Sequence, residues 1–412
     1  MNSFNIVDTL YISRLGTTAL AALGFTMPLV MFFMGIIFGL SVGTTSALSR
    51  AYGEGDHEKV RGLATDSLVL IALLVSIASL VGYFLIDDMF LLMGAHHDII
   101  PLIHRFMAIW YCGMTLIALL QGGNACIRAT GDTHFPAAIM MLTALINIVL
   151  DPFLIFGWAH FPRMGIAGAA LTLVIANSLT CAASLYVLSC RKKILSPRLL
   201  HSGTITSWRK ILHVGVPSMI SNMISPVSAA VIIWMVSDMG HGAVAALGIT
   251  TRIEALAVVV FYALGAGVSI FTGQNYGAGN YGRIADITRI AAKYSMCWGA
   301  VIAALLWIFA KKIPLFFDQH PLVITYVTQY LHIVPISYGA MGVLITANAA
   351  LNAMGKPLPA TVLILLRAFG LYIPLAWLAE RYYNFLGILM ALFLTNIAIG
   401  LVSYLWNKHA AS

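Results

Sequence analysis

Long runs of apolar residues dominate the sequence, and short polar segments separate them. A membrane-spanning helix needs about 20 mostly apolar residues. Eleven runs approach or exceed that length, at residues 19–48, 64–86, 101–127, 135–157, 165–190, 211–236, 243–272, 285–310, 322–353, 358–379 and 384–406. Because the apolar positions are continuous rather than alternating, they predict helices and not the strands of a β-barrel. The pattern therefore predicts an all-α integral membrane protein.

Composition agrees with a chain whose main solvent is the lipid bilayer. Of the 412 residues, 60% are hydrophobic and 9% are charged, whereas soluble domains carry roughly 25% charged residues. The net charge of +8 comes from Lys and Arg in the short connections, which is a signal of membrane orientation rather than of nucleic-acid binding. The richer set of connections includes residues 191–210 and the C-terminal end. We therefore expect a multi-pass protein of the cell inner membrane with a cytoplasmic C-terminus.

An internal repeat divides the chain into two halves. The segments that begin at Ala22 and Ala246 share Ala-Leu-Gly near their start and Tyr-Gly-x-Gly near their end, at a constant offset of 224 residues. Such parallel repeats are common in secondary transporters. They predict an N-terminal bundle over 1–190, a cytoplasmic linker over 191–210 and a C-terminal bundle over 211–412.

The same offset bears on the start of the chain. It aligns Met1 with Ser225, which lies deep inside a predicted span. The first half is therefore expected to begin upstream of Met1, with residues 1–13 as the outer half of a first helix. The expected architecture is two pseudo-symmetric six-helix bundles, represented here by eleven complete spans and a partial first helix.

Three acidic residues lie well inside apolar runs: Asp8, Asp151 and Glu254. Carboxylates there are costly and usually mark ion or proton pathways. Asn147 shares a helix face with Asp151, and Pro152 deprives a carbonyl one turn earlier of its hydrogen-bond donor. Such a cluster of oxygens suits Na⁺, and a proton competes because burial disfavours the charged carboxylate. The alternative is a kinked helix in which Asp151 is bonded to its packing partners.

Several segments in order resemble the multidrug and toxic compound extrusion (MATE) family. "VDTLYISRLGTTALAALGF" resembles the first helix and its following loop, and "YGEGD" and "YGAGN" resemble the glycine loops after the second and eighth helices. "NIVLDPFLIFG" followed by "MGIAGAALT" resembles the fifth and sixth helices. The similarity extends over nearly the whole chain. It implies an antiporter that exports amphipathic organic cations or drugs in exchange for Na⁺ or H⁺ by alternating access.

The resemblance also implies roles for individual residues in the first half. Asp8 matches the first-helix aspartate of the family, Asn147 and Asp151 match a fifth-helix pair, and Thr172 matches a sixth-helix threonine that completes a cation site in some members. Na⁺ bound by Asp8, Asn147 and Asp151 is the one metal expected. Two alternatives remain open: Asp8 could pair with Arg14, and the Thr172 hydroxyl could bond to its own helix backbone.

In the second half, Glu254 and Arg367 are candidates for a cavity or substrate role. Glu254 could line the cavity or could pair with Arg367, which lies in the middle of a predicted span. Some family members place a glutamate after a Gly-x-Pro motif in the seventh helix. Here the motif at 215–217 leads to Ser225 instead, so ion coupling is expected in the first half.

Two other classes of function are less well supported. A lipid or polysaccharide-precursor flippase would share the two-bundle architecture, but it should line its cavity with cationic residues, whereas the candidates here are mostly acidic. An enzyme is not expected, since the sequence has no H-E-x-x-H motif, and the lack of an ATP-binding G-x-x-x-x-G-K-[ST] motif argues against ATP-driven transport by this chain. We expect no cofactor apart from the coupling ion, no nucleic-acid partner, and a monomer.

Overall fold

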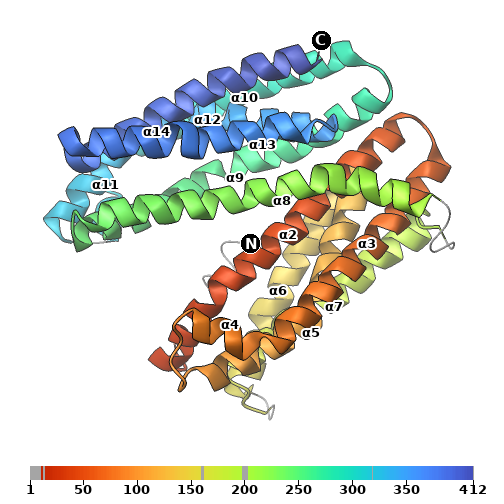
Figure 1. Cartoon of the computed structure of the whole chain (residues 1–412), viewed down its shortest axis with the longest axis horizontal. Helices are drawn as coiled ribbons and strands as arrows, with labels where there is room; N and C mark the ends of the chain where they lie inside the picture. Colours follow the sequence, from red (N-terminus) through yellow and green to blue (C-terminus); the bar gives the residue numbers. More distant parts are fainter. Residues whose placement is uncertain (1–10, 13, 159–161, 197–202, 318, 412) are drawn as a thin grey trace. The chain divides into compact units, whose positions relative to one another are not determined.

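The structure is a computed structural model that describes residues 11–12, 14–158, 162–196, 203–317 and 319–411 (Figure 1). Asp8, one of the predicted site residues, lies outside the described residues. The described chain consists of helices joined by short turns, without a β-strand in these ranges. This confirms the predicted all-α class.

The helices follow the predicted apolar runs. They are α2 (Thr17–Gly53), α3 (His57–Phe84), α4 (Ile86–Leu92), α5 (Ile100–Ala129), α6 (His134–Phe156), α7 (Ile166–Tyr186) with a π-helical end (Val187–Arg191), α8 (Thr204–Ser237), α9 (His241–Gly277), α10 (Tyr281–Ile308), α11 (Pro321–Ile333), α12 (Tyr338–Ala353), α13 (Pro357–Leu365) and α14 (Ile373–Ala411). Short 3₁₀ turns cover Pro314–Phe316 and Val334–Ser337, and a π-helical segment, η5, covers Leu366–Tyr372.

Ten candidate membrane spans lie in the described part of the chain. The last of them, Pro357–His409, holds two of the predicted runs. The backbone of Asn384 leaves the helical region there, with φ 48° and ψ −133°. This break falls where the predicted spans 358–379 and 384–406 meet, so all eleven predicted runs are helical. One difference is that α8 begins at Thr204, inside the stretch expected to be linker.

The chain forms two compact units. Unit 1 comprises Met1–Leu48 and Asp56–Val216, and unit 2 comprises Ser49–Gly55 and Pro217–Ser412. In unit 1, α5 packs between α3 and α7, and α6 packs on α7. In unit 2, α12 packs against α9, α10 and α14. Both α2 and α8 contribute residues to each unit.

The end of α2 packs against the end of α9 within unit 2 through two close backbone contacts. Gly53 lies against the carbonyl of Gln274, and Gly277 lies against the carbonyl of Arg50. A Cβ atom at either glycine would overlap that carbonyl, so only glycine allows this approach. The offset of 224 relates Gly53 to Gly277 and Arg50 to Gln274, so the two contacts are symmetric.

A third contact lies between them. Gly273 packs against the Ser49 side chain, and these two positions are also related by the offset of 224. All three contacts therefore join repeat-equivalent positions of α2 and α9 within unit 2.

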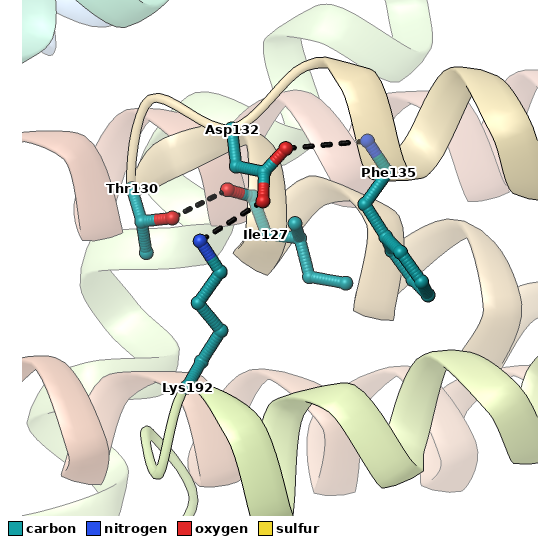
Figure 2. Close-up of polar contacts among 5 residues, drawn as sticks. All are labelled: Ile127, Thr130, Asp132, Phe135 and Lys192. Carbon is teal, nitrogen blue, oxygen red and sulfur yellow. Dashed lines mark hydrogen bonds and ion pairs between the residues drawn. The ribbon is translucent and has the colours of Figure 1, made fainter.

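In unit 1, the turn between α5 and α6 is tied to the end of α7 (Figure 2). The Lys192 ammonium lies 2.9 Å from Asp132, and the backbone N–H of Phe135 donates to the same carboxylate at 3.2 Å. Burial raises the pKa of Asp132, but the hydrogen bonds from Lys192 and from the backbone outweigh it, so this pKa is held below its usual range. These contacts fix the start of α6, the helix that carries Asp151.

Replacing Asp132 by Asn should lower the stability of the protein at pH 7 by about 0.5–1 kcal/mol, because an ion pair near the surface is lost. A carboxyl whose folded-state pKa is depressed stabilises the fold above its unfolded pKa, and that contribution is lost as the pH falls through the folded value. Melting temperatures of parent and variant should therefore differ at pH 7 and begin to converge as the pH falls below about 4. As a control, Asp286→Asn removes an exposed pair with Arg289 and should have no effect. Equal melting of Asp132→Asn and parent at pH 7 would contradict a stabilising role for the pair.

Candidate functional site

The two polar site residues of α6 are almost completely buried. Asn147 and Asp151 are each 1% exposed and lie one helical turn apart. Pro152, which follows Asp151, is buried inside the helix as well. Large apolar side chains of the same helix are exposed, among them Met141, Leu145 and Val149. Because α6 turns its polar positions inward and its apolar positions outward, it is suited to a lipid environment.

The hydrogen bonds of Asn147 leave one oxygen available. Its side-chain N–H donates to the Thr143 carbonyl at 2.8 Å, while its buried Oδ1 has no hydrogen-bond partner among the described residues. A buried polar atom without a partner is costly. A cation or a hydrogen-bond donor at this oxygen would remove that cost.

Thr172 of α7 is fully buried, and its hydroxyl donates to the Gly168 carbonyl at 3.0 Å. The structure therefore has the local backbone bond that the sequence left open as an alternative. This bond uses the proton of the hydroxyl but not its oxygen lone pairs. Thr172 can still contribute an oxygen ligand.

The register of the α6–α7 pair places Thr172 level with Asp151. The hydroxyl of Thr143 on α6 donates to Thr180 on α7 at 3.0 Å. Asp151 lies eight residues after Thr143, and Thr172 lies eight residues before Thr180. Since the two helices are joined by a short connection and run in opposite directions, equal steps reach the same level. The structure thus brings Asn147, Asp151 and Thr172 to one region of unit 1.

A glycine allows this close approach of the helices. Gly168 lies against the Leu154 carbonyl, where a Cβ atom would overlap the backbone of α6. The backbone N–H groups of Met164 and Gly165 donate to the Leu154 and Ile155 carbonyls at 3.1 and 3.2 Å. The connection therefore caps the C-terminal end of α6 and holds α7 beside Asp151.

Gly168→Ala should destabilise the protein by about 1–3 kcal/mol, because the added methyl group forces two closely packed backbones apart. The drop should be visible as a lower melting temperature in detergent. Gly24→Ala is the matched control, since no atom lies within 4 Å of its built Cβ. That variant should be neutral or more stable by up to about 1 kcal/mol. If Gly168→Ala has the same melting temperature as the parent, α6 and α7 do not approach each other closely at Gly168.

The two candidates of unit 2 have separate partners. Glu254 on α9 is half-buried and accepts a hydrogen bond from the Tyr330 hydroxyl at 2.8 Å. Tyr330 in turn lies 3.1 Å from the Tyr338 hydroxyl. Arg367 donates to Asn396 Oδ1 through Nε at 3.3 Å and Nη2 at 3.1 Å. A direct Glu254–Arg367 pair, one of the two alternatives for Glu254, is not formed.

Sequence reasoning missed Tyr330, Tyr338 and Asn396. Asn396 could have been noticed as a lone amide in the apolar run "FLTNIAIG". The two tyrosines flank Pro335 in a run that reads as ordinary apolar helix, so they carried no comparable signal. Their role depends on contacts between residues that are far apart in the sequence.

Comparison with known proteins shows which family the chain belongs to. The family model described as MatE matches residues 1–153 and 217–378, which are parts of both halves. The chain belongs to the MatE family. It is similar to the FAD transporter of Shewanella oneidensis, with 35% identity over 402 residues that cover 97% of this chain and 89% of the relative. It is also similar to the multidrug export protein MepA of Staphylococcus aureus, with 22% identity over 392 residues that cover 94% and 84%.

A solved MatE family structure supports the fold. The Vibrio cholerae MATE transporter VcmN in the bent form is 29% identical, with a TM-score of 0.94 and coverage of 99% of this chain and 93% of that one. These findings confirm the resemblance seen in the sequence. As a MatE family member the chain is a multi-pass membrane transporter and not an enzyme.

Proposed function

We propose that the chain is a secondary active antiporter of the inner membrane that exports amphipathic small molecules in exchange for Na⁺ or H⁺. The buried group of Asn147, Asp151 and Thr172, with the partnerless Oδ1 of Asn147, carries this proposal. Carboxylate, amide and hydroxyl oxygens are the ligands that Na⁺ prefers. A carboxylate at this depth can alternatively take up a proton.

Coupling follows if the ion binds one conformation better than another. An ion at Asp151 neutralises a buried negative charge beside the close α6–α7 contact. Release of the ion restores that charge, which is disfavoured in an apolar region. Loading and unloading would therefore change the relative stability of the two conformations that alternating access requires.

The first candidate cargo is an amphipathic organic cation or drug. Several relatives of the chain are named as multidrug export or resistance proteins. The half-buried carboxylate of Glu254 suits such a cargo, because it offers a negative charge to a cation.

A second candidate cargo is a flavin dinucleotide. The relative with 35% identity is named as a FAD transporter. The specific observation is Arg367, which is half-buried and forms no ion pair with a carboxylate in the described part of the chain. A guanidinium in this state attracts phosphate and would repel a cationic drug.

The proposal is tested by expressing the chain in cells that lack their own exporters and measuring ethidium efflux and FAD release. We expect at least one of these rates to exceed that of cells with an empty vector. The excess should disappear when the proton gradient is collapsed by a protonophore or when Na⁺ is removed, whichever ion is coupled. Efflux that persists without either gradient, or no excess efflux of either compound, would contradict the proposal.

A further inference from the structure

Two half-buried charges of opposite sign lie in unit 2, and each forms hydrogen bonds with a fully buried neutral side chain. Tyr330 is 2% exposed and binds Glu254, and Asn396 is 1% exposed and binds Arg367. Neither charge is neutralised by an ion pair in the described ranges. Half-buried charges that are positioned but not neutralised are unusual in an apolar protein and point to a ligand.

One junction in the backbone fixes both charges. The 3₁₀ turn Val334–Ser337 leads directly into α12 at Tyr338. Ser337 accepts a hydrogen bond from the Asn396 amide at 3.0 Å, while the next residue, Tyr338, contacts Tyr330. The side chains that bind Arg367 and Glu254 are thus held by the consecutive residues Ser337 and Tyr338. The two charges therefore keep a fixed position relative to each other.

Each charged group has capacity left for a ligand. Tyr330 gives its one proton to Glu254 Oε2, so Tyr338 must donate to Tyr330, and this chain of hydroxyls reinforces a single carboxylate oxygen. The other oxygen of Glu254 can accept from a ligand. Arg367 has five N–H donors, of which Asn396 takes two. The remaining donors can form paired bonds to a phosphate oxygen pair.

Two tyrosine side chains lie on the elements that carry the two charges, Tyr262 on α9 with Glu254 and Tyr372 in η5 with Arg367. Tyr262 lies about two turns beyond Glu254 on α9, and its side chain is 61% exposed. Tyr372 lies five residues beyond Arg367 in the π-helical segment η5, where residues five apart are joined by the hydrogen-bonding pattern. Tyrosine faces of this kind stack on flat ring systems.

Building on the proposed export of a flavin dinucleotide, we propose that Glu254 and Arg367 form a two-charge substrate site that selects aromatic ligands carrying both a ring N–H donor and a phosphate. Arg367 binds the phosphate, Glu254 accepts from the ring N–H, and Tyr262 stacks on the ring. A purely cationic drug satisfies Glu254 but meets the positive charge of Arg367. A flavin without phosphate satisfies Glu254 but leaves Arg367 unused.

The test is equilibrium binding of FAD and of riboflavin, which lacks phosphate, to the purified full chain in detergent without any ion gradient. Arg367→Gln keeps an N–H donor for Asn396 but removes the charge, and it should weaken FAD binding about tenfold or more while changing riboflavin binding less than about twofold. Arg367→Lys keeps the positive charge but lacks the planar guanidinium group. Its affinity for FAD should lie between those of the parent and of Arg367→Gln. Glu254→Gln should weaken the binding of FAD and of riboflavin by a similar factor.

Arg252→Met is the matched control, because it removes an exposed positive charge two residues from Glu254 on a different face of α9. It should leave both affinities within about twofold of the parent. Melting temperatures of all variants show whether each is folded. The proposed site is overturned if the parent does not bind FAD or if Arg367→Gln binds FAD as tightly as the parent does. It is also overturned if Arg367→Gln weakens the binding of FAD and of riboflavin by the same factor.

The binding test and the transport test fail independently. If FAD binds in the expected pattern but no gradient drives export, the antiport proposal fails and the site stands. If export is gradient-driven but FAD binding ignores Arg367, the site fails and the antiport proposal stands.

Discussion

Export should fall roughly 5- to 150-fold when Asp151 is replaced by Asn, the range that corresponds to a coupling free energy of about 1–3 kcal/mol. The asparagine amide has nearly the size and shape of the carboxylate, so packing around the 1%-exposed position is kept. It carries no charge for Na⁺ to balance and cannot take up a proton. The variant should therefore remain folded while the difference between its ion-loaded and ion-free states disappears. The measurement is the rate of ethidium or FAD efflux, normalised to the amount of protein in the membrane.

Asp66→Asn is the matched control for this prediction. Asp66 is as buried as Asp151, at 1% exposed, but its carboxylate accepts from the Thr204 hydroxyl at 3.0 Å and ties α3 to the start of α8. We expect this variant to lose stability and to keep its transport rate per folded molecule. An Asp151→Asn variant that exports as fast as the parent would remove Asp151 from the coupling site, and Glu254 would be the next acid to test.

A disulfide between cysteines introduced at Ser49 and Gly273 should stop export almost completely, and a reductant should restore it. A Cβ atom built at Gly273 lies 2.8 Å from the Ser49 Cβ, so a small shift reaches the spacing of about 3.8 Å found in disulfides. These positions are repeat equivalents on α2 and α9. Alternating access moves the two repeats against each other, and we expect the ends of α2 and α9 to separate in one of the two conformations.

The single variants Ser49→Cys and Gly273→Cys, treated with the same oxidant, show whether oxidation alone has an effect. This control is needed because Cys112, Cys190 and Cys297 are exposed free cysteines. Gel mobility after proteolysis between α2 and α9 reports the fraction cross-linked. If the fully cross-linked double variant exports at the parent rate, the ends of α2 and α9 stay together during transport and the pivot lies elsewhere.

Most of the fold could be predicted from the sequence because the bilayer permits few alternatives. An apolar run of sufficient length must satisfy its own backbone hydrogen bonds and so becomes a helix. The repeat offset also paired Gly53 with Gly277 in advance, and these two glycines pack in equivalent ways. The sequence could not reveal what those glycines pack against, because a close backbone approach depends on the three-dimensional arrangement and leaves no periodic pattern.

The candidate site was only partly predictable. Asn147 and Asp151 could be placed together because a spacing of four fixes a shared helix face. The hydroxyl of Thr172 had two chemically sensible partners, and only coordinates distinguish them. The partner of Glu254 is Tyr330, 76 residues away. No local rule favours that tyrosine over Arg367, so the two alternatives could not be separated from the sequence.

The most direct test of ion coupling at Asp151 is ion flux in liposomes that contain the purified parent or the Asp151→Asn variant. An outward gradient of the exported compound is imposed, and Na⁺ entry is followed with an isotope and H⁺ entry with a pH-sensitive dye. For the parent we predict that the compound gradient drives entry of one of these ions, and for Asp151→Asn we predict no entry above that of empty liposomes. Equal compound-driven ion entry with parent and variant would contradict the central claim that the buried oxygen cluster of α6 and α7 couples the ion to export.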